Sequence, residues 1–231
     1  MSLDVQRIRA LCFDVDGTLR DTDDKWVNRF ERFLKPLRFV FPGRNVRPFA
    51  RWVVMTIETP GNLVLYLLDR LGFDDEVARL FKRMAKRDNK QMRDFWLIPG
   101  IAETLSKLKE KYPMAVVSAR GKEGTVAFLE QSELMHLFDA IATSQTCEHT
   151  KPYPDPVVWA AEQMCVDPRT CLMIGDTTVD IKAGRAAGAQ TVGVLCGFGT
   201  EKELRRARAD LILESPAQLV EVMMGLQDDP G

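Results

Sequence analysis

Short runs of apolar residues recur along the chain, and segments with the apolar spacing of helices lie between them. Each run is apolar at successive positions, as expected for a strand buried on both faces of a parallel sheet. The predicted strands are Ala10–Asp14, Met114–Ser118, Ala140–Thr143, Thr170–Gly175 and Thr191–Leu195, with Asp210–Leu213 as a possible edge strand. The predicted helices are Ile101–Lys111, Gly121–Glu133, Pro154–Cys165 and Thr178–Gly188.

This alternation of strands and helices predicts an α/β fold with a doubly wound parallel sheet, a Rossmann-like core. Ligands of such sheets bind at the carboxyl ends of the strands. The polar residues predicted at or just beyond those ends are Asp14, Ser118, Thr143 and Asp176. We therefore expect the chemistry of the protein to lie among them.

One long segment interrupts the alternation. Residues 21–94 show no convincing strand, only a helical pattern that breaks at Pro42-Gly43, at Thr59-Pro60-Gly61 and at Gly72. Three or four helices are expected there. We predict a small α-helical cap domain at 21–94, inserted into a core domain made of residues 1–20 and 95–231.

The distribution of charge is informative only in the insert. The whole chain has a net charge of −1, with 45% hydrophobic and 28% charged residues, and this balance points to neither nucleic acid nor a membrane as a partner. From Lys25 to Arg93, however, 16 Lys and Arg residues stand against 7 Asp and Glu residues, a net charge of +9. Such a basic insert is either a solvated surface or a means of attracting an anionic substrate to an acidic core.

The cysteines and the apolar stretches indicate the compartment. The first ten residues lack the apolar run of a signal peptide, and charged residues and a Pro-Gly pair interrupt the apolar stretch Phe49–Phe73, which is too broken for a membrane span. The five cysteines have no CxxC spacing. We expect free, mostly buried thiols and a cytoplasmic protein.

Two aspartates, Asp14 and Asp16, follow the first predicted strand, and Gly17 and Thr18 come directly after them. Neighbouring carboxylates repel each other, but a divalent cation between them makes the arrangement favourable. Mg²⁺ prefers such oxygen ligands together with water and substrate phosphate. The pair therefore indicates a metal and catalytic site, although a single Asp-Gly dipeptide alone would equally suit a solvated turn.

Three later stretches supply the other parts of such a site. Ser118 ends a strand just before a helix, where a hydroxyl and backbone N–H groups form an anion site. Lys151 lies in a proline-rich segment before another helix. Asp176 follows an apolar strand, and Asp180 lies one helical turn later, which gives a second acidic cluster.

Taken in order, the stretches DVDGT, VVS, KPYPDP and GDTTVDI resemble the four motifs of the haloacid dehalogenase superfamily. The resemblance covers the whole chain and is strongest to the phosphoglycolate phosphatase-like branch. It implies a Mg²⁺-dependent phosphatase that hydrolyses a small-molecule phosphate monoester, and the insert lies where the family has its helical cap.

The resemblance also implies roles for individual residues. Asp14 would be the nucleophile that forms an aspartyl-phosphate, and Asp16 the general acid and then the general base. Ser118, the Ala119 amide and Lys151 would bind the phosphoryl oxygens. The metal would bind to the Asp14 carboxylate, the Asp16 backbone carbonyl and Asp176, with support from Asp180 directly or through a water.

Two positions depart from the family pattern. Ala119 stands where many relatives have asparagine, so only its amide is expected to bind phosphate. Arg20 replaces a small or apolar residue and is expected either to reach the mouth of the site or to face solvent. The cap loop at residues 56–62 would determine specificity, with Thr59 and Asn62 as candidates, but nothing in it specifies the substrate. The sequence also leaves the oligomeric state open.

Other functions stay open. Asp16 argues against a dehalogenase, which needs no second acid. A phosphomutase of the β-phosphoglucomutase type would retain Asp16 but usually has Glu-Asp where this chain has Gly175-Asp176. A nucleotidase or pyrophosphatase fits the same motifs. A non-enzymatic phospholigand-binding protein is expected to lose Asp14, Asp16 or Lys151, and all three are present.

Overall fold

The computed structural model describes residues 3–21 and 97–225 of the 231-residue chain. The chain divides into two units, residues 1–22 with 95–231 and residues 23–94. The described residues all belong to the first unit. The predicted helical cap, with Thr59 and Asn62, lies outside the described residues and stays a prediction.

The first unit is built on a sheet of six parallel strands in the order β3-β2-β1-β4-β5-β6. The strands are β1 (Ala10–Phe13), β2 (Met114–Val117), β3 (Ala140–Ala142), β4 (Cys171–Gly175), β5 (Gln190–Val194) and β6 (Leu211–Leu213). β1 lies in the middle, with Phe13 opposite Val116 of β2 on one side and Ile174 of β4 on the other. All six predicted strands are therefore confirmed, and β6 forms an edge of the sheet.

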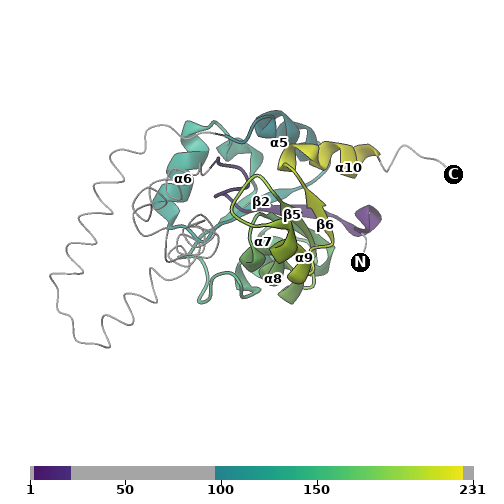
Figure 1. Cartoon of the computed structure of the whole chain (residues 1–231). Helices are drawn as coiled ribbons and strands as arrows, with labels where there is room; N and C mark the ends of the chain where they lie inside the picture. The colour runs from purple at the N-terminus through teal and green to yellow at the C-terminus, as the bar shows by residue number, and fades with distance from the viewer. Residues whose placement is uncertain (1–2, 22–96, 226–231) are drawn as a thin grey trace, which may run out of the picture. The chain divides into compact units, whose positions relative to one another are not determined.

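Helices cover both faces of this sheet, as Figure 1 shows. The α-helices are α5 (Ile101–Lys109), α6 (Lys122–Gln131), α7 (Asp155–Gln163), α8 (Thr178–Ala186), α9 (Glu201–Arg206) and α10 (Leu219–Gly225). Short 3-10 helices are η1 (Val5–Arg7), η4 (Met135–Leu137), η5 (Pro168–Thr170) and η6 (Pro216–Gln218). Helices α5 and α10 lie on one side of the sheet, and α7, α8 and α9 lie on the other. In the part of the chain that the structure describes, no helix is both long and apolar enough for a membrane span.

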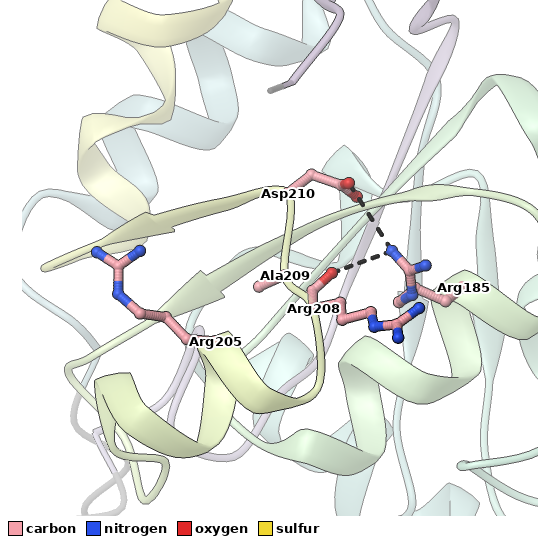
Figure 2. A pocket seen from close by; sticks show the side chains of 5 residues that line it. All are labelled: Arg185, Arg205, Arg208, Ala209 and Asp210. Atoms are coloured by element: carbon pink, nitrogen blue, oxygen red, sulfur yellow. Dashed lines mark hydrogen bonds and ion pairs between the residues drawn. The ribbon is translucent and has the colours of Figure 1, made fainter. Parts of the chain in front are cut away.

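A pocket of about 460 Å³ lies where the loop after α9 leads into β6. Its lining is Arg185, Arg205, Arg208, Ala209 and Asp210. Arg185 Nη1 donates a hydrogen bond of 3.1 Å to the Arg208 carbonyl and lies 3.9 Å from Asp210 Oδ1 (Figure 2). Asp210 directly precedes β6, so this pocket is at the amino ends of the strands, opposite the end where a ligand is expected.

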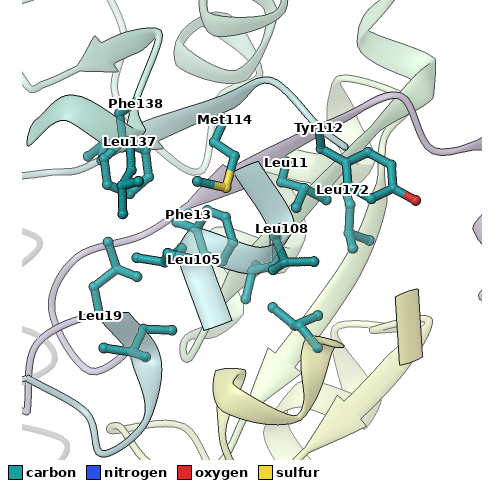
Figure 3. Close-up of a cluster of buried hydrophobic side chains, with 14 of the residues drawn as sticks. Leu11, Phe13, Leu19, Leu105, Leu108, Tyr112, Met114, Leu137, Phe138 and Leu172 are labelled. Atoms are coloured by element: carbon teal, nitrogen blue, oxygen red, sulfur yellow. The ribbon is translucent and has the colours of Figure 1, made fainter. Parts of the chain in front are cut away.

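The core differs on the two faces of the sheet because strand residues alternate between them. On the α5 and α10 side the strands present large side chains, among them Leu11, Phe13 and Met114, which pack with Leu105 and Leu108 of α5 (Figure 3). On the other side they present Ala10, Cys12, Ala115, Ala140 and Ala142, packed against α7 and α8. Small residues of β1, β2 and β3 let α7 approach the sheet closely, whereas in α8 it is Gly184 that leaves room for Met173 and Thr191 of the sheet.

The cysteines confirm one expectation and correct another. The structure contains no disulfide among the described residues, and all five cysteines are free. Cys12 and Cys171 are buried, but Cys147 and Cys196 are only partly buried and Cys165 is exposed. The expectation that most of them are buried was therefore wrong. Cys165 follows the end of α7 in a left-handed turn, with φ of 55°, and the turn lies at the surface.

Candidate active site

The two central strands of the sheet, β1 and β4, deliver the first acidic residues of the site. Asp14 follows β1, and its amide donates a hydrogen bond of 2.9 Å to the Ile174 carbonyl of β4. Asp176 follows β4 by one residue. The strands that follow β1, β2 and β3, extend the sheet on one side, and those that follow β4, β5 and β6, extend it on the other. The two aspartates therefore flank the point where the strand order reverses. In doubly wound sheets this point opens a crevice at the carboxyl ends of the strands.

Lys151 joins two of the predicted aspartates. Its Nζ donates hydrogen bonds of 2.6 Å to Asp14 Oδ1 and of 2.6 Å to Asp180 Oδ1. All three side chains are buried, with Lys151 and Asp14 each 6% exposed and Asp180 1%. A buried lysine that contacts two buried carboxylates is fixed in position and stays charged.

Asp180 is oriented by the beginning of α8. Its Oδ2 accepts hydrogen bonds from the Thr177 amide at 3.0 Å and from the Thr177 hydroxyl at 2.6 Å. A Cβ on Gly175 would overlap with the Asp180 side chain, so the position before Asp176 admits only glycine. Both carboxylate oxygens of Asp180 therefore have donors, Lys151 for Oδ1 and Thr177 for Oδ2.

Asp176 is held by backbone and side-chain donors. Its Oδ2 accepts a hydrogen bond of 2.6 Å from the Phe198 amide, and Thr18 Oγ1 lies 3.5 Å from Oδ1. Gly17 has φ of +81°, a conformation that favours glycine, and a Cβ there would overlap with Asp176 Oδ2. The sequence reasoning missed the Phe198 amide, because a backbone donor leaves no signal in the residue type.

The charges of this cluster do not balance. Carboxylate oxygens of Asp14, Asp176 and Asp180 lie within 4.8 Å of one another, and Lys151 contacts two of these three carboxylates, Asp14 and Asp180. Burial, with the charges of Asp180 and Asp16, raises the pKa of Asp14 to about 7, although Lys151 acts to lower it. Burial lowers the pKa of Lys151, but the charges of Asp14 and Asp180 outweigh burial and raise it above its usual value.

Two units of negative charge therefore remain when all three carboxylates are ionised. A divalent cation would neutralise them, and carboxylate oxygens are the donors that Mg²⁺ prefers. The residues present fit such an ion. Asp16 is not part of this cluster, so its predicted contact with the metal through the backbone carbonyl stays a prediction.

The side chain of Asp16 contacts two arginines instead. Arg120 Nε lies 2.7 Å from Asp16 Oδ2, and Arg20 Nη1 lies 3.5 Å from Asp16 Oδ1. Arg20 is buried, with 9% exposure, because a tight turn brings its carbonyl within 2.9 Å of the Gly17 amide. Of the two positions expected for Arg20, facing solvent is wrong, and its side chain reaches the site.

The loop after β2 supplies the predicted phosphate-binding residues. The Ser118 amide donates to the Ala142 carbonyl at 2.9 Å, and its hydroxyl accepts a hydrogen bond of 3.1 Å from the Arg120 amide. The Ser118 hydroxyl therefore keeps its own proton to donate. The Ala119 amide makes no hydrogen bond with another described residue. Both groups are available to phosphoryl oxygens in this structure.

Arg120 is the site residue that the sequence reasoning missed. The available signal was its place two residues after Ser118, beyond the carboxyl end of a predicted strand. A long basic side chain in that loop can reach a neighbouring strand end. Its contact with Asp16 shows that it does.

Comparison with known proteins identifies relatives over most of the chain. The family model described as haloacid dehalogenase-like hydrolase matches residues 11–194. "Probable phosphatase IndB" of Dickeya dadantii is 28% identical and covers 90% of both chains. Pyrophosphatase PpaX of Bacillus pumilus is 24% identical, over 94% of this chain and 96% of its own. Phosphoglycolate phosphatase of Escherichia coli K12 is 25% identical, over 90% and 89%.

Solved structures agree with the fold. A hydrolase from Pseudomonas syringae matches with a TM-score of 0.72 and 27% identity, over 94% of this chain and 99% of that chain. A structure from Haemophilus somnus, described as a predicted phosphoglycolate phosphatase, matches with a TM-score of 0.72 over the same shares. Its 21% identity supports the fold alone.

Proposed function

Because the chain belongs to the haloacid dehalogenase-like hydrolase family and is a phosphatase of its phosphoglycolate phosphatase-like branch, we propose that it hydrolyses a small-molecule phosphate monoester with the help of Mg²⁺. The observation that supports this most is the cluster of Asp14, Asp176 and Asp180 around Lys151. In this cluster the Asp14 carboxylate lies beside a fixed cation, and the excess negative charge would suit a divalent metal.

Asp14 is the nucleophile in this proposal. A carboxylate oxygen of Asp14 attacks phosphorus, and the bond between phosphorus and the ester oxygen breaks to give an aspartyl-phosphate and an alkoxide. Lys151 keeps the Asp14 side chain in one position through its 2.6 Å hydrogen bond. Fixing the nucleophile in this way removes part of the entropic cost of the attack.

Asp16 transfers the proton. It donates a proton to the departing alkoxide and then takes one from the water that attacks the aspartyl-phosphate. That second attack breaks the bond between phosphorus and Asp14 and releases inorganic phosphate with Asp14 regenerated. The contact with Arg120 fixes the Asp16 carboxylate for both steps.

The remaining groups bind the phosphoryl oxygens. The Ser118 hydroxyl, the Ala119 amide and the Lys151 ammonium each have a donor to offer, and positioned donors stabilise the charge that develops on these oxygens. Bound Mg²⁺ would supply positive charge between the nucleophile and the phosphate. Asp14, Asp176 and the Asp16 backbone would bind it, with Asp180 holding Lys151 alongside.

Three alternatives differ in their support. The relationship to PpaX makes a pyrophosphatase or nucleotidase a second candidate within the same chemistry. A phosphomutase of the β-phosphoglucomutase type is less favoured, because Gly175 stands where that type usually has glutamate. A non-enzymatic binding protein has no need for the three buried carboxylates and lysine found here.

The free cysteines favour the predicted cytoplasmic location.

A phosphate-release assay tests the proposal. We expect release of phosphate from p-nitrophenyl phosphate with Mg²⁺, none with EDTA, and recovery when Mg²⁺ is restored. A panel of phosphoglycolate, sugar phosphates, nucleotides and pyrophosphate then identifies the substrate. Absence of release from every compound would contradict the proposal, and conversion of β-glucose 1-phosphate without phosphate release would favour the mutase.

A further inference from the structure

The Arg120 guanidinium contacts Asp16 differently from the two exposed arginines that bind a carboxylate with two nitrogens. Arg169 binds Asp167 with two nitrogens, Nε at 3.1 Å and Nη2 at 2.6 Å. Arg205 does the same with Glu201, at 2.7 Å and 2.6 Å. Both are exposed surface pairs that use the planar fork of the guanidinium. Arg120 instead lies with Nε 2.7 Å from Asp16 Oδ2, while its Nη1 makes no hydrogen bond with a described residue.

The Nη1 group of Arg120 can donate a hydrogen bond to a further acceptor. This nitrogen is buried and has no hydrogen-bond partner among the described residues. A buried donor without a partner costs free energy, so such a group in a functional site calls for an acceptor that arrives with a ligand. The side chain as a whole is partly exposed, which leaves a route for that ligand.

We propose that Arg120 is a specificity residue that recognises an anionic group on the leaving group of the substrate. The proposal rests on the proposed function, in which Asp16 protonates the ester oxygen. Asp16 must then lie within hydrogen-bond reach of that oxygen. Because Arg120 touches Asp16, its guanidinium lies next to the atoms that follow the ester oxygen. A carboxylate or a second phosphate there is the acceptor that a guanidinium binds best.

The inference selects a substrate class. Phosphate esters of small hydroxy acids, and compounds with a second phosphate close to the scissile oxygen, present an anion at this place. Neutral leaving groups such as those of simple alkyl or sugar phosphates do not.

A matched pair of substrates tests the proposal. 2-Phosphoglycolate and 2-hydroxyethyl phosphate have the same length, but only the first has a carboxylate beside the ester oxygen. We expect the wild type to show the higher kcat/KM for 2-phosphoglycolate. Arg120→Ala should lower that kcat/KM at least about tenfold more than it lowers the value for 2-hydroxyethyl phosphate, the scale of one charge-assisted hydrogen bond.

Two further variants separate recognition from positioning. Arg120→Gln keeps an N–H donor for Asp16 but removes the charge, so the neutral substrate should recover while 2-phosphoglycolate stays impaired. Arg169→Ala breaks an Arg–Asp pair far from the site, at η5 before the amino end of β4, and should leave both substrates unchanged. Thermal unfolding shows whether each variant is folded, and Arg120→Gln provides the comparison if Arg120→Ala is not.

The outcomes are distinct. An equal loss on both substrates in Arg120→Ala and Arg120→Gln, or a wild type without preference for the anionic substrate, would overturn the inference and leave Arg120 as a residue that only positions Asp16. Hydrolysis of p-nitrophenyl phosphate by the wild type shows that the proposed function holds in that case. A wild type that releases phosphate from no substrate contradicts the proposed function itself.

Discussion

The ammonium group of Lys151 lies 2.6 Å from Asp14, and this contact joins the predicted nucleophile to the only lysine buried among the described residues. Lys151 also holds Asp180 at the same distance. It is thus both a proposed ligand of the phosphoryl group and the charge that offsets the buried carboxylates before a metal binds. The two roles lead to different measurements.

Replacing Lys151 by methionine removes the cation and keeps most of the side-chain volume. We expect the free energy of unfolding of the metal-free protein to fall by about 3–5 kcal/mol, because buried carboxylates lose their partner. Phosphatase activity should fall at least about a hundredfold, since removing one donor to the developing charge has effects of that order. Urea unfolding in EDTA and a phosphate-release assay give the two values.

Lys107→Met is the matched control. Lys107 forms an exposed ion pair with Glu103 on α5 at 2.7 Å, and surface pairs of this kind contribute little. The free energy of unfolding of Lys107→Met should therefore match that of the wild type within experimental error. If Lys151→Met were as stable as the control variant, the cluster would not depend on Lys151 for its charge balance.

Asp14→Asn should abolish turnover, because an amide is a poor nucleophile toward phosphorus. The metal-free variant should also be more stable than the wild type at neutral pH. The pKa of Asp14 rises from an ordinary value of about 4 to about 7 in the folded protein, chiefly through burial. A carboxyl with a raised pKa favours folding when protonated, so its contribution is present at low pH and lost as pH rises from about 4 to about 7.

The stability difference between Asp14→Asn and the wild type should therefore widen in favour of the variant from pH 4 to pH 8. Thermal or urea unfolding in EDTA at several pH values measures it. A difference that does not change with pH would contradict the raised pKa of Asp14. More than a few percent of wild-type activity in the variant would contradict its role as nucleophile.

The loss of rate caused by Asp16→Asn should depend on the leaving group of the substrate. A poor leaving group needs a proton from Asp16, whereas p-nitrophenolate leaves without one. The ratio of wild-type to variant rates should thus be larger for an alkyl phosphate than for p-nitrophenyl phosphate. Steady-state rates on both substrates measure it, and equal ratios would point to a structural role for Asp16.

Gly17→Ala should damage the site more than the fold. The added Cβ meets Asp176 Oδ2, and Gly17 has φ of +81°, so Asp176 must move or the turn must change. We expect weaker Mg²⁺ activation and lower kcat. Gly124→Ala in α6 is the control, because a Cβ there meets open space. Its free energy of unfolding should equal that of the wild type or be higher by about 0.5–1 kcal/mol. Equal activities of the two variants would show that Asp176 tolerates displacement.

The sheet could be predicted because its strands are buried on both faces and give uninterrupted apolar runs. Predicted and observed strand ends differ by about one residue, as at Ala10–Asp14 against Ala10–Phe13. The short helices α9 and α10 were not predicted. For α9 a signal existed, since Thr200 and Glu203 have the spacing of a capping box and their side chains and amides do bind each other.

The site could be predicted where function depends on residue type and strand order. Asp14, Lys151, Asp176 and Asp180 meet because parallel strands bring their carboxyl ends to one edge. Contacts that depend on side-chain direction in a loop could not be predicted, and Arg120 is the main case. Whether Arg20 reached the site was undecided for the same reason, because the turn after Asp16 determines where its side chain goes.

The position of β1 has a consequence for biosynthesis. Of the described strands β1 is made first, and its neighbours in the sheet, β2 and β4, begin only at Met114 and Cys171. The nascent chain must therefore hold β1 without either partner until β2 is made, and the long separation along the sequence slows their pairing. A product that ends before Asp176 contains the proposed nucleophile Asp14 but not its opposite carboxylate. We therefore expect activity only after synthesis has passed Asp180.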